Sequence, residues 1–205
     1  MKRILLLSTI LFVSVMTTAC INNFAIQELN NKAETYINNG DAETAICRLK
    51  SSLDLDNEVY QTHYNLGVAY NGVGKYEESI EELNKALELK PDLSDAYYTL
   101  AVSKEAVAYQ ILDSHEDMNN MNLDELSDFN NKAADAVETY NQYLVRKADA
   151  PETEQINEKI AELNNKIKEC TDIYDSKNAE KDNQVQQEVT ENNSNIEEPV
   201  QAEQE

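Results

Sequence analysis

The chain has 205 residues, enough for one to one and a half ordinary domains, and it is strongly acidic, with 17 Lys and Arg against 39 Asp and Glu. The formal charge of −22 argues against nucleic-acid binding, because phosphate neutralisation requires clustered Lys and Arg. Only 4 Gly and 3 Pro interrupt a sequence rich in helix-forming residues, which favours an all-α fold.

Residues 1–19 have the pattern of a signal peptide. Lys2 and Arg3 precede an uncharged, mostly apolar run from Ile4 to Met16. That run is too short to span a bilayer, since a membrane-spanning helix needs roughly 20 apolar residues. Small residues follow the run, and Cys20 stands directly behind them. The pattern predicts that residues 1–19 are removed.

The end of this segment resembles the signal of bacterial lipoproteins, in which a cysteine after a small residue is diacylated and becomes the new N-terminus. The resemblance implies lipidation of Cys20, a membrane link through that lipid, and a tether over residues 20–25. It also implies a location in the bacterial cell envelope, with an outer membrane favoured because Ile21 is not Asp. The alternative is ordinary cleavage before Cys20, which yields a secreted or periplasmic protein with a free thiol.

Two segments 34 residues apart share a pattern of small and large residues. In residues 60–93 the pattern consists of Leu66, Gly67, Ala69, Tyr70, Gly74, Tyr76, Ala86 and Pro91. Residues 26–59 repeat it in register with Ala33, Tyr36, Gly40, Ala45 and Leu49. The pattern resembles the tetratricopeptide repeat, in which small residues let two antiparallel helices approach closely. The resemblance implies an all-α, right-handed α-solenoid of about three helical hairpins.

The third repeat, over residues 94–150, departs from the first two at its turn. Ala108 stands where both earlier repeats have a glycine, so we expect the first helix to continue to about Leu112. Beyond a polar loop, Asn122 and Glu125 have the spacing of a capping box, which predicts the start of a second helix. We therefore expect a long hairpin that completes an array over residues 26–151. The alternative is an ordinary repeat followed by an unrelated helix.

Behind Pro151, apolar residues follow one another at spacings of four and three from Ile156 to Tyr174. One interpretation is a capping helix over residues 152–175, which arrays of this family commonly carry. The other is a short coiled coil that makes a homodimer through residues 156–174. We favour the cap and a monomer, because fewer than four heptads is short for a coiled coil. Residues 176–205 are rich in Glu, Gln and Asn, and we expect a disordered acidic tail.

The residues that could carry chemistry are few. His63 occupies a packing position of the repeat, and His115 lies in a polar loop beside Glu116 and Asp117 without the spacing of a calcium loop. We find no phosphate-binding loop, nucleophile elbow or Cys-x-x-Cys pair. Cys170 and the cysteine of the first repeat are expected to be free thiols. We expect neither an enzyme nor a bound metal or cofactor.

The family resemblance implies a concave groove lined by the first helix of each hairpin. The positions of this chain that match the family's groove positions are Asn30, Ile37, Tyr64, Asn65, Val68, Asn71, Tyr98 and Val102. None of them is Lys or Arg, so a free peptide carboxylate is not the expected ligand. Aromatic and apolar side chains favour an extended segment or a helix instead. The expected function is a membrane-anchored scaffold that binds a protein or peptide partner. The alternative is a structural or surface-exposed spacer lipoprotein without a dedicated ligand.

Overall fold

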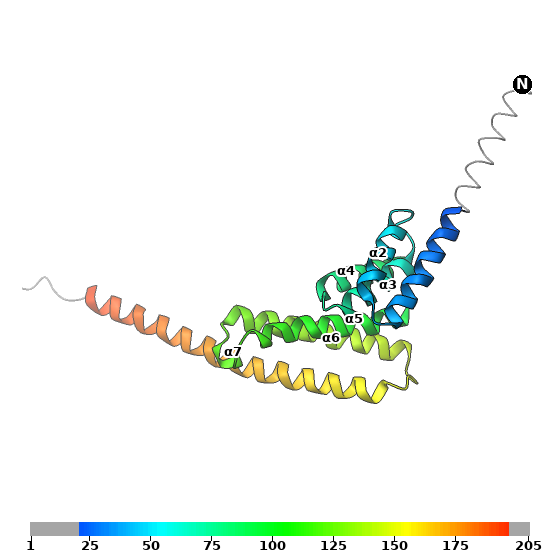
Figure 1. Cartoon of the computed structure of the whole chain (residues 1–205). Helices are drawn as coiled ribbons and strands as arrows, with labels where there is room; N and C mark the ends of the chain where they lie inside the picture. Colours follow the sequence, from blue (N-terminus) through cyan, green and yellow to red (C-terminus); the bar gives the residue numbers. More distant parts are fainter. Residues whose placement is uncertain (1–20, 197–205) are drawn as a thin grey trace, which may run out of the picture.

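A computed structural model of the chain describes residues 21–196, and its side chains are described as far as Glu191. Within residues 21–196 all regular secondary structure is helical, and consecutive helices run antiparallel to one another (Figure 1). A first helix covers residues 21–38 of this range. The later helices are α2 (Ala42–Leu53), α3 (Tyr60–Gly72), α4 (Tyr76–Leu89), α5 (Ser94–Asp113), the short 3-10 helix η1 (Met118–Asn120), α6 (Leu123–Arg146) and α7 (Thr153–Ile196). This arrangement confirms the predicted all-α solenoid.

Two glycines 34 residues apart turn the chain between the helices of the first two hairpins. Gly40 and Gly74 have φ angles of +78° and +75°, a left-handed conformation that residues with a Cβ avoid. The residue after each glycine donates a backbone hydrogen bond of 2.9 Å to a carbonyl five residues earlier, which closes the end of the helix. In the third hairpin Ala108 lies inside α5, fully buried, and the helix runs on to Asp113.

The long third hairpin contains most of the larger core. α6 begins at the predicted capping box, in which the Asn122 side chain accepts from the backbone of Glu125 and the Glu125 carboxylate accepts from the backbone of Asn122. The side chains of α6 that face α5 and α7 have at most 1% of their surface exposed: Leu126, Phe129, Ala133, Ala136, Tyr140 and Tyr143.

α7 covers this core with its apolar face. Ile156, Leu163 and Cys170 have at most 1% of their surface exposed and belong to the same cluster as the α6 side chains. The apolar stripe is therefore already packed within the chain. This packing contradicts the coiled-coil alternative for residues 156–174, because the seam of such a dimer would have to be free.

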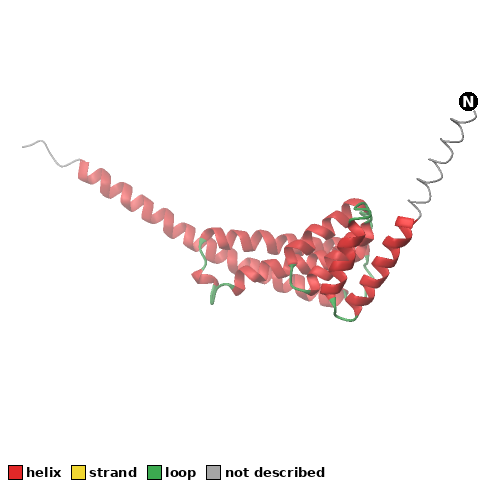
Figure 2. Cartoon of the chain, turned by 45° about the horizontal axis from the view of Figure 1, so that its top comes forward, coloured by secondary structure: helices red, strands yellow, loops and turns green. Residues whose placement is uncertain are grey.

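The two ends of the described chain differ from our predictions. Residues 21–25 are helical, so they do not form the expected tether before the first helix. α7 does not end near residue 175 but continues to Ile196, where we expected disorder, and it projects beyond the hairpin (Figure 2). Both errors have one cause: no Gly or Pro interrupts either stretch, so a helix nucleated by packing extends at little cost. The predictions for residues 1–20 and 197–205 lie outside the described range.

No helix in the part of the chain that the structure describes is both long and apolar enough to cross a membrane.

Candidate functional site

Five of the predicted binding residues form a strip on two adjacent helices. Tyr64, Val68 and Asn71 lie on α3, and Tyr98 and Val102 lie on α5; each is partly accessible to solvent. The helices are joined at this strip, because the Asn71 amide donates a hydrogen bond of 2.8 Å to the Ser103 hydroxyl. We call these five residues the α3–α5 strip. Ile37, on the first helix, is half-buried against the core of the first hairpin.

Asn30 and Asn65 were expected in the groove, but the structure places them in the interior. They are 3% and 6% exposed, respectively, and the Asn65 amide donates to the Asn30 carbonyl oxygen at 3.2 Å. The Asn30 amide in turn donates to the hydroxyls of Ser52 and Thr62 at 3.2 and 2.8 Å. This network satisfies polar groups between the first helix, α2 and α3, so neither amide is available to a ligand. The prediction was wrong for these two residues.

The hydroxyl group of Tyr64 lies in an acidic environment. The Tyr64 ring packs against the cluster formed by Leu83, Ala96 and Leu100. Burial raises the pKa of the Tyr64 hydroxyl, and the nearby carboxylates of Asp95 and Glu34 raise this pKa further. The hydroxyl therefore stays protonated at physiological pH and can donate a hydrogen bond to a ligand.

Tyr98 is held by two other aromatic rings. Its ring centroid lies 6.4 Å from that of Tyr140 in an edge-to-face arrangement and 5.5 Å from that of Tyr143. Both partners belong to α6 and are almost fully buried. Aromatic pairs at these separations are worth about 0.5–1.5 kcal/mol beyond their buried area. Tyr98 is therefore a rigid part of the strip, and binding would cost it little side-chain entropy.

The cations around α5 already have partners. Lys147 pairs with Asp95, and Lys159 pairs with Glu105 at 2.8 Å. The Arg146 guanidinium lies 3.8 Å from the centre of the Tyr97 ring. A peptide carboxylate approaching the α3–α5 strip would thus have to compete with existing contacts for every one of these three cations. The strip suits uncharged or basic segments better than acidic ones.

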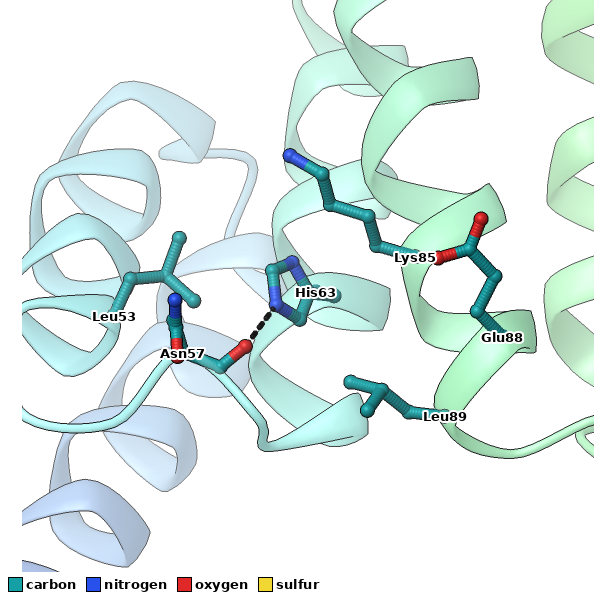
Figure 3. Close-up of a pocket in the computed structure, with 6 residues that line it drawn as sticks. All are labelled: Leu53, Asn57, His63, Lys85, Glu88 and Leu89. Carbon is teal, nitrogen blue, oxygen red and sulfur yellow. Dashed lines mark hydrogen bonds between the residues drawn. The ribbon is translucent and has the colours of Figure 1, made fainter.

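A hollow of about 310 Å³ lies away from this strip, between α2, the start of α3 and the end of α4 (Figure 3). It is lined by Leu53, Asn57, His63, Lys85, Glu88 and Leu89. His63 is 4% exposed; one ring nitrogen contacts the Asn57 carbonyl at 2.8 Å and the other contacts the Glu82 carboxylate at 2.6 Å. Because both nitrogens are engaged within the protein, His63 joins the two hairpins rather than offering a free base.

No cluster of three or more His, Cys, Asp or Glu side chains in the described range is placed to hold a metal ion. His115 instead lies 3.4 Å from Glu125, at the start of α6. Cys170 is buried, and burial raises the pKa of its thiol to about 11, so the thiolate that could bind a metal is disfavoured. Cys47 and Cys170 are both free thiols.

Sequence reasoning missed the polar contacts that join consecutive hairpins. The Ser79 hydroxyl donates 2.7 Å to the Gly67 carbonyl and lies 2.8 Å from the Ser103 hydroxyl. Together with the Asn30 network, this contact places buried hydroxyl and amide groups at both junctions of the array. The available signal was the occurrence of small polar residues at positions where the repeat has apolar ones, as at Ser52 and Ser79.

The comparisons with known proteins agree with this geometry. Residues 60–93 match the model of the tetratricopeptide repeat family. A search of curated protein sequences found no match. Among solved structures, the chain resembles the TPR2B domain of yeast Sti1 in complex with pHsp70, with a TM-score of 0.53 and 17% identity over 69% of this chain and 98% of that one.

Two further structures show the same likeness. The second TPR domain of human RPAP3, in complex with an Hsp70 peptide, has a TM-score of 0.52 and 15% identity over 70% of this chain and 98% of that one. MamA has a TM-score of 0.53 and 19% identity over 84% of this chain and 86% of that one. The fold thus defines an α-solenoid of helical hairpins. The chain is a tetratricopeptide repeat protein.

Proposed function

We propose that this protein is a lipid-anchored scaffold of the bacterial cell envelope that binds a peptide or helical segment of another protein on the α3–α5 strip. The observation that carries the proposal is the strip itself. It places partly accessible tyrosine and valine side chains at corresponding positions of two consecutive hairpins. Such rigid aromatic and apolar residues give contact area at a low entropic cost, which is typical of binding surfaces.

The similar structures support peptide binding as the mode of action. The yeast Sti1 domain was solved in a complex with pHsp70, and the human RPAP3 domain with an Hsp70 peptide. The peptide of the RPAP3 complex has the sequence SGPTIEEVD, which is acidic at its C-terminus. In the present chain the cations near α5 are paired with Asp95 and Glu105. We therefore propose a different ligand, an apolar segment without a carboxylate that must be clamped.

The membrane anchor rests on the sequence. Cys20 follows the small residues at the end of the signal-like segment, and we propose that it is diacylated. The acyl chains would anchor the protein, since each buried CH₂ contributes about 0.8 kcal/mol. Ordinary cleavage, which yields a secreted or periplasmic protein, remains the alternative. Labelling with a fatty-acid analogue separates the two, because only the lipoprotein incorporates the label at Cys20.

A capture experiment tests partner binding. We would cross-link cells that produce the wild type or the Val68→Glu/Val102→Glu variant, and compare the proteins recovered with each. The matched control is Val145→Glu, because Val145 is 83% exposed and lies on α6. We expect a protein that is recovered with the wild type and the control but not with the double variant, at unchanged helicity. Recovery of the same proteins with all three would contradict binding at the strip. Recovery of none would favour a spacer role.

A further inference from the structure

Two large apolar side chains at the start of the described chain are not packed against the protein. Ile21 is 67% exposed and Phe24 is 70% exposed, although both lie in a regular helix. Residues three apart share a helix face, so the two side chains form one apolar edge. Ile26 of the same helix is only 4% exposed and belongs to the buried core. The helix thus has one face on the protein and a separate apolar edge in solvent.

This edge follows directly after Cys20. Phe24 is four residues from Cys20, and a chain spans at most about 3.6 Å per residue, so the two Cα atoms lie within about 14 Å in any conformation. The headgroup layer on each side of a bilayer is roughly 5–8 Å thick, since the total thickness is about 40–45 Å and the hydrocarbon core about 30 Å. A lipid on Cys20 would therefore keep Ile21 and Phe24 within reach of this layer.

The charge distribution of the first helix is compatible with such a contact. The chain carries a formal charge of −22, yet no residue from Ile21 to Gln27 is charged. The first charged residue is Glu28, and its carboxylate pairs with Lys32 at 2.6 Å. The apolar edge can therefore approach an anionic lipid surface without the repulsion that the rest of the chain would experience.

We infer that Ile21 and Phe24 form a membrane-contacting edge, which inserts into the interfacial layer of the bilayer beside the acylated Cys20. This inference rests on the proposed lipid anchor. Apolar side chains of helices at this boundary lie roughly 5–10 Å deep. The contact gives the first helix a second attachment to the membrane besides the lipid, so that the array is held at a defined orientation rather than on a free tether.

Tryptophan fluorescence tests the inference without background, because the chain contains no Trp. The full-length protein carrying Phe24→Trp would be purified from a lipoprotein-processing bacterium. It would then be reconstituted into vesicles of phosphatidylethanolamine and phosphatidylglycerol. We expect phospholipids with brominated acyl chains to lower its emission by about twofold or more, because a side chain roughly 5–10 Å deep contacts those chains. The control is Val185→Trp: Val185 is 51% exposed and lies near the far end of α7 (Figure 1).

Mass spectrometry of the purified protein reports whether Cys20 carries acyl chains. Acylated protein with quenching at position 24 and none at position 185 supports the edge. Acylated, vesicle-bound protein without quenching at position 24 overturns the edge and leaves the anchor intact. Equal quenching at both positions overturns a contact confined to the first helix. Protein without acyl chains that stays in solution overturns both the anchor and the edge.

Discussion

Gly67 sets the distance between α3 and α4. A Cβ added at this position would lie 2.5 Å from Cγ and 2.9 Å from Cδ2 of Leu83, a side chain that is fully buried. The corresponding residues of the other two hairpins, Ala33 and Ala101, are fully buried as well. A small residue at this position therefore allows the close approach of the paired helices throughout the array.

We expect Gly67→Ala to destabilise the protein. Overpacking costs roughly 1–3 kcal/mol, and the higher helix propensity of Ala returns up to about 1 kcal/mol, so a net loss of about 1–2 kcal/mol is predicted. Urea unfolding measures this loss. Gly72→Ala is the control, because its Cβ would lie 3.7 Å from the nearest atom outside its own helix turn, Cβ of Ala42. A Gly67→Ala variant as stable as the wild type would show that the helices separate without cost.

The Asn30 network makes a second prediction at the same scale. Asn30→Leu would leave the buried amide of Asn65 and two hydroxyl groups without their partner, and unsatisfied buried groups cost about 1–3 kcal/mol each. We expect a loss of about 2–4 kcal/mol by urea unfolding. Asn31→Leu, on the exposed side of the same helix, should change stability by less than about 0.5 kcal/mol. Equal stabilities of the two variants would contradict a structural role for the network.

At the scale of elements, three hydroxyl–carboxylate contacts join the long hairpin internally and to α7. Tyr140 donates to Glu105 at 2.5 Å, Tyr109 donates to Glu162 at 2.9 Å, and Tyr143 donates to Glu152. For each tyrosine, burial and then the carboxylate partner raise the pKa of the hydroxyl well above its usual value of 10. The third hairpin and the cap are therefore coupled by groups that must stay protonated.

This coupling predicts loss of stability at alkaline pH. Above pH 10 the unfolded chain releases the tyrosine protons while the folded chain keeps them, so the free energy of unfolding falls as the pH rises. Each such tyrosine contributes a slope of about 1.4 kcal/mol per pH unit. Tyr140→Phe should remove one such contribution from the pH dependence of urea unfolding. Tyr174→Phe is the control, since its hydroxyl makes no hydrogen bond in the described chain. The same slope in wild type and Tyr140→Phe would refute the coupling.

α7 has a packed part and a free part. Its last described contact with the hairpin is Lys177, whose ammonium group donates to the carbonyls of Asn119 and Met121 at 2.7 Å. We expect a chain ending at Lys181 to lose helicity but to keep its unfolding free energy within about 0.5 kcal/mol. A chain ending at Glu169 loses the buried Cys170 side chain and should be destabilised by about 2 kcal/mol or more. Circular dichroism with urea titration checks both. A large loss on cutting at Lys181 would contradict this division.

At the scale of the whole molecule, the period of 34 residues accounts for what the sequence predicted well. Gly40 and Gly74 mark turns that need positive φ angles, and Ala108 marks the place where that turn is missing. A local rule about one residue, applied at a fixed period, thus places whole hairpins. The capping box at Asn122 is equally local, and for this reason the start of α6 was also predicted.

The binding surface and the ends of the chain were harder to predict. Matching a family position places Asn30 on a helix, but it does not show that Ser52 and Thr62, distant in sequence, close over its amide. Burial by such neighbours is a property of the packed array. The helix beyond residue 175 was missed because we required an apolar periodicity there. A helix that is already nucleated by packing needs only the absence of breakers to continue.

The central claim is that the α3–α5 strip contacts a partner protein. Its most direct test is a photo-reactive phenylalanine analogue placed at position 64, on α3, in the living cell, with the same analogue at the exposed position 145 on α6 for comparison. We predict a light-dependent cross-link to one specific protein from position 64 and none to that protein from position 145. No cross-link from position 64, or the same cross-link from both positions, would contradict the claim.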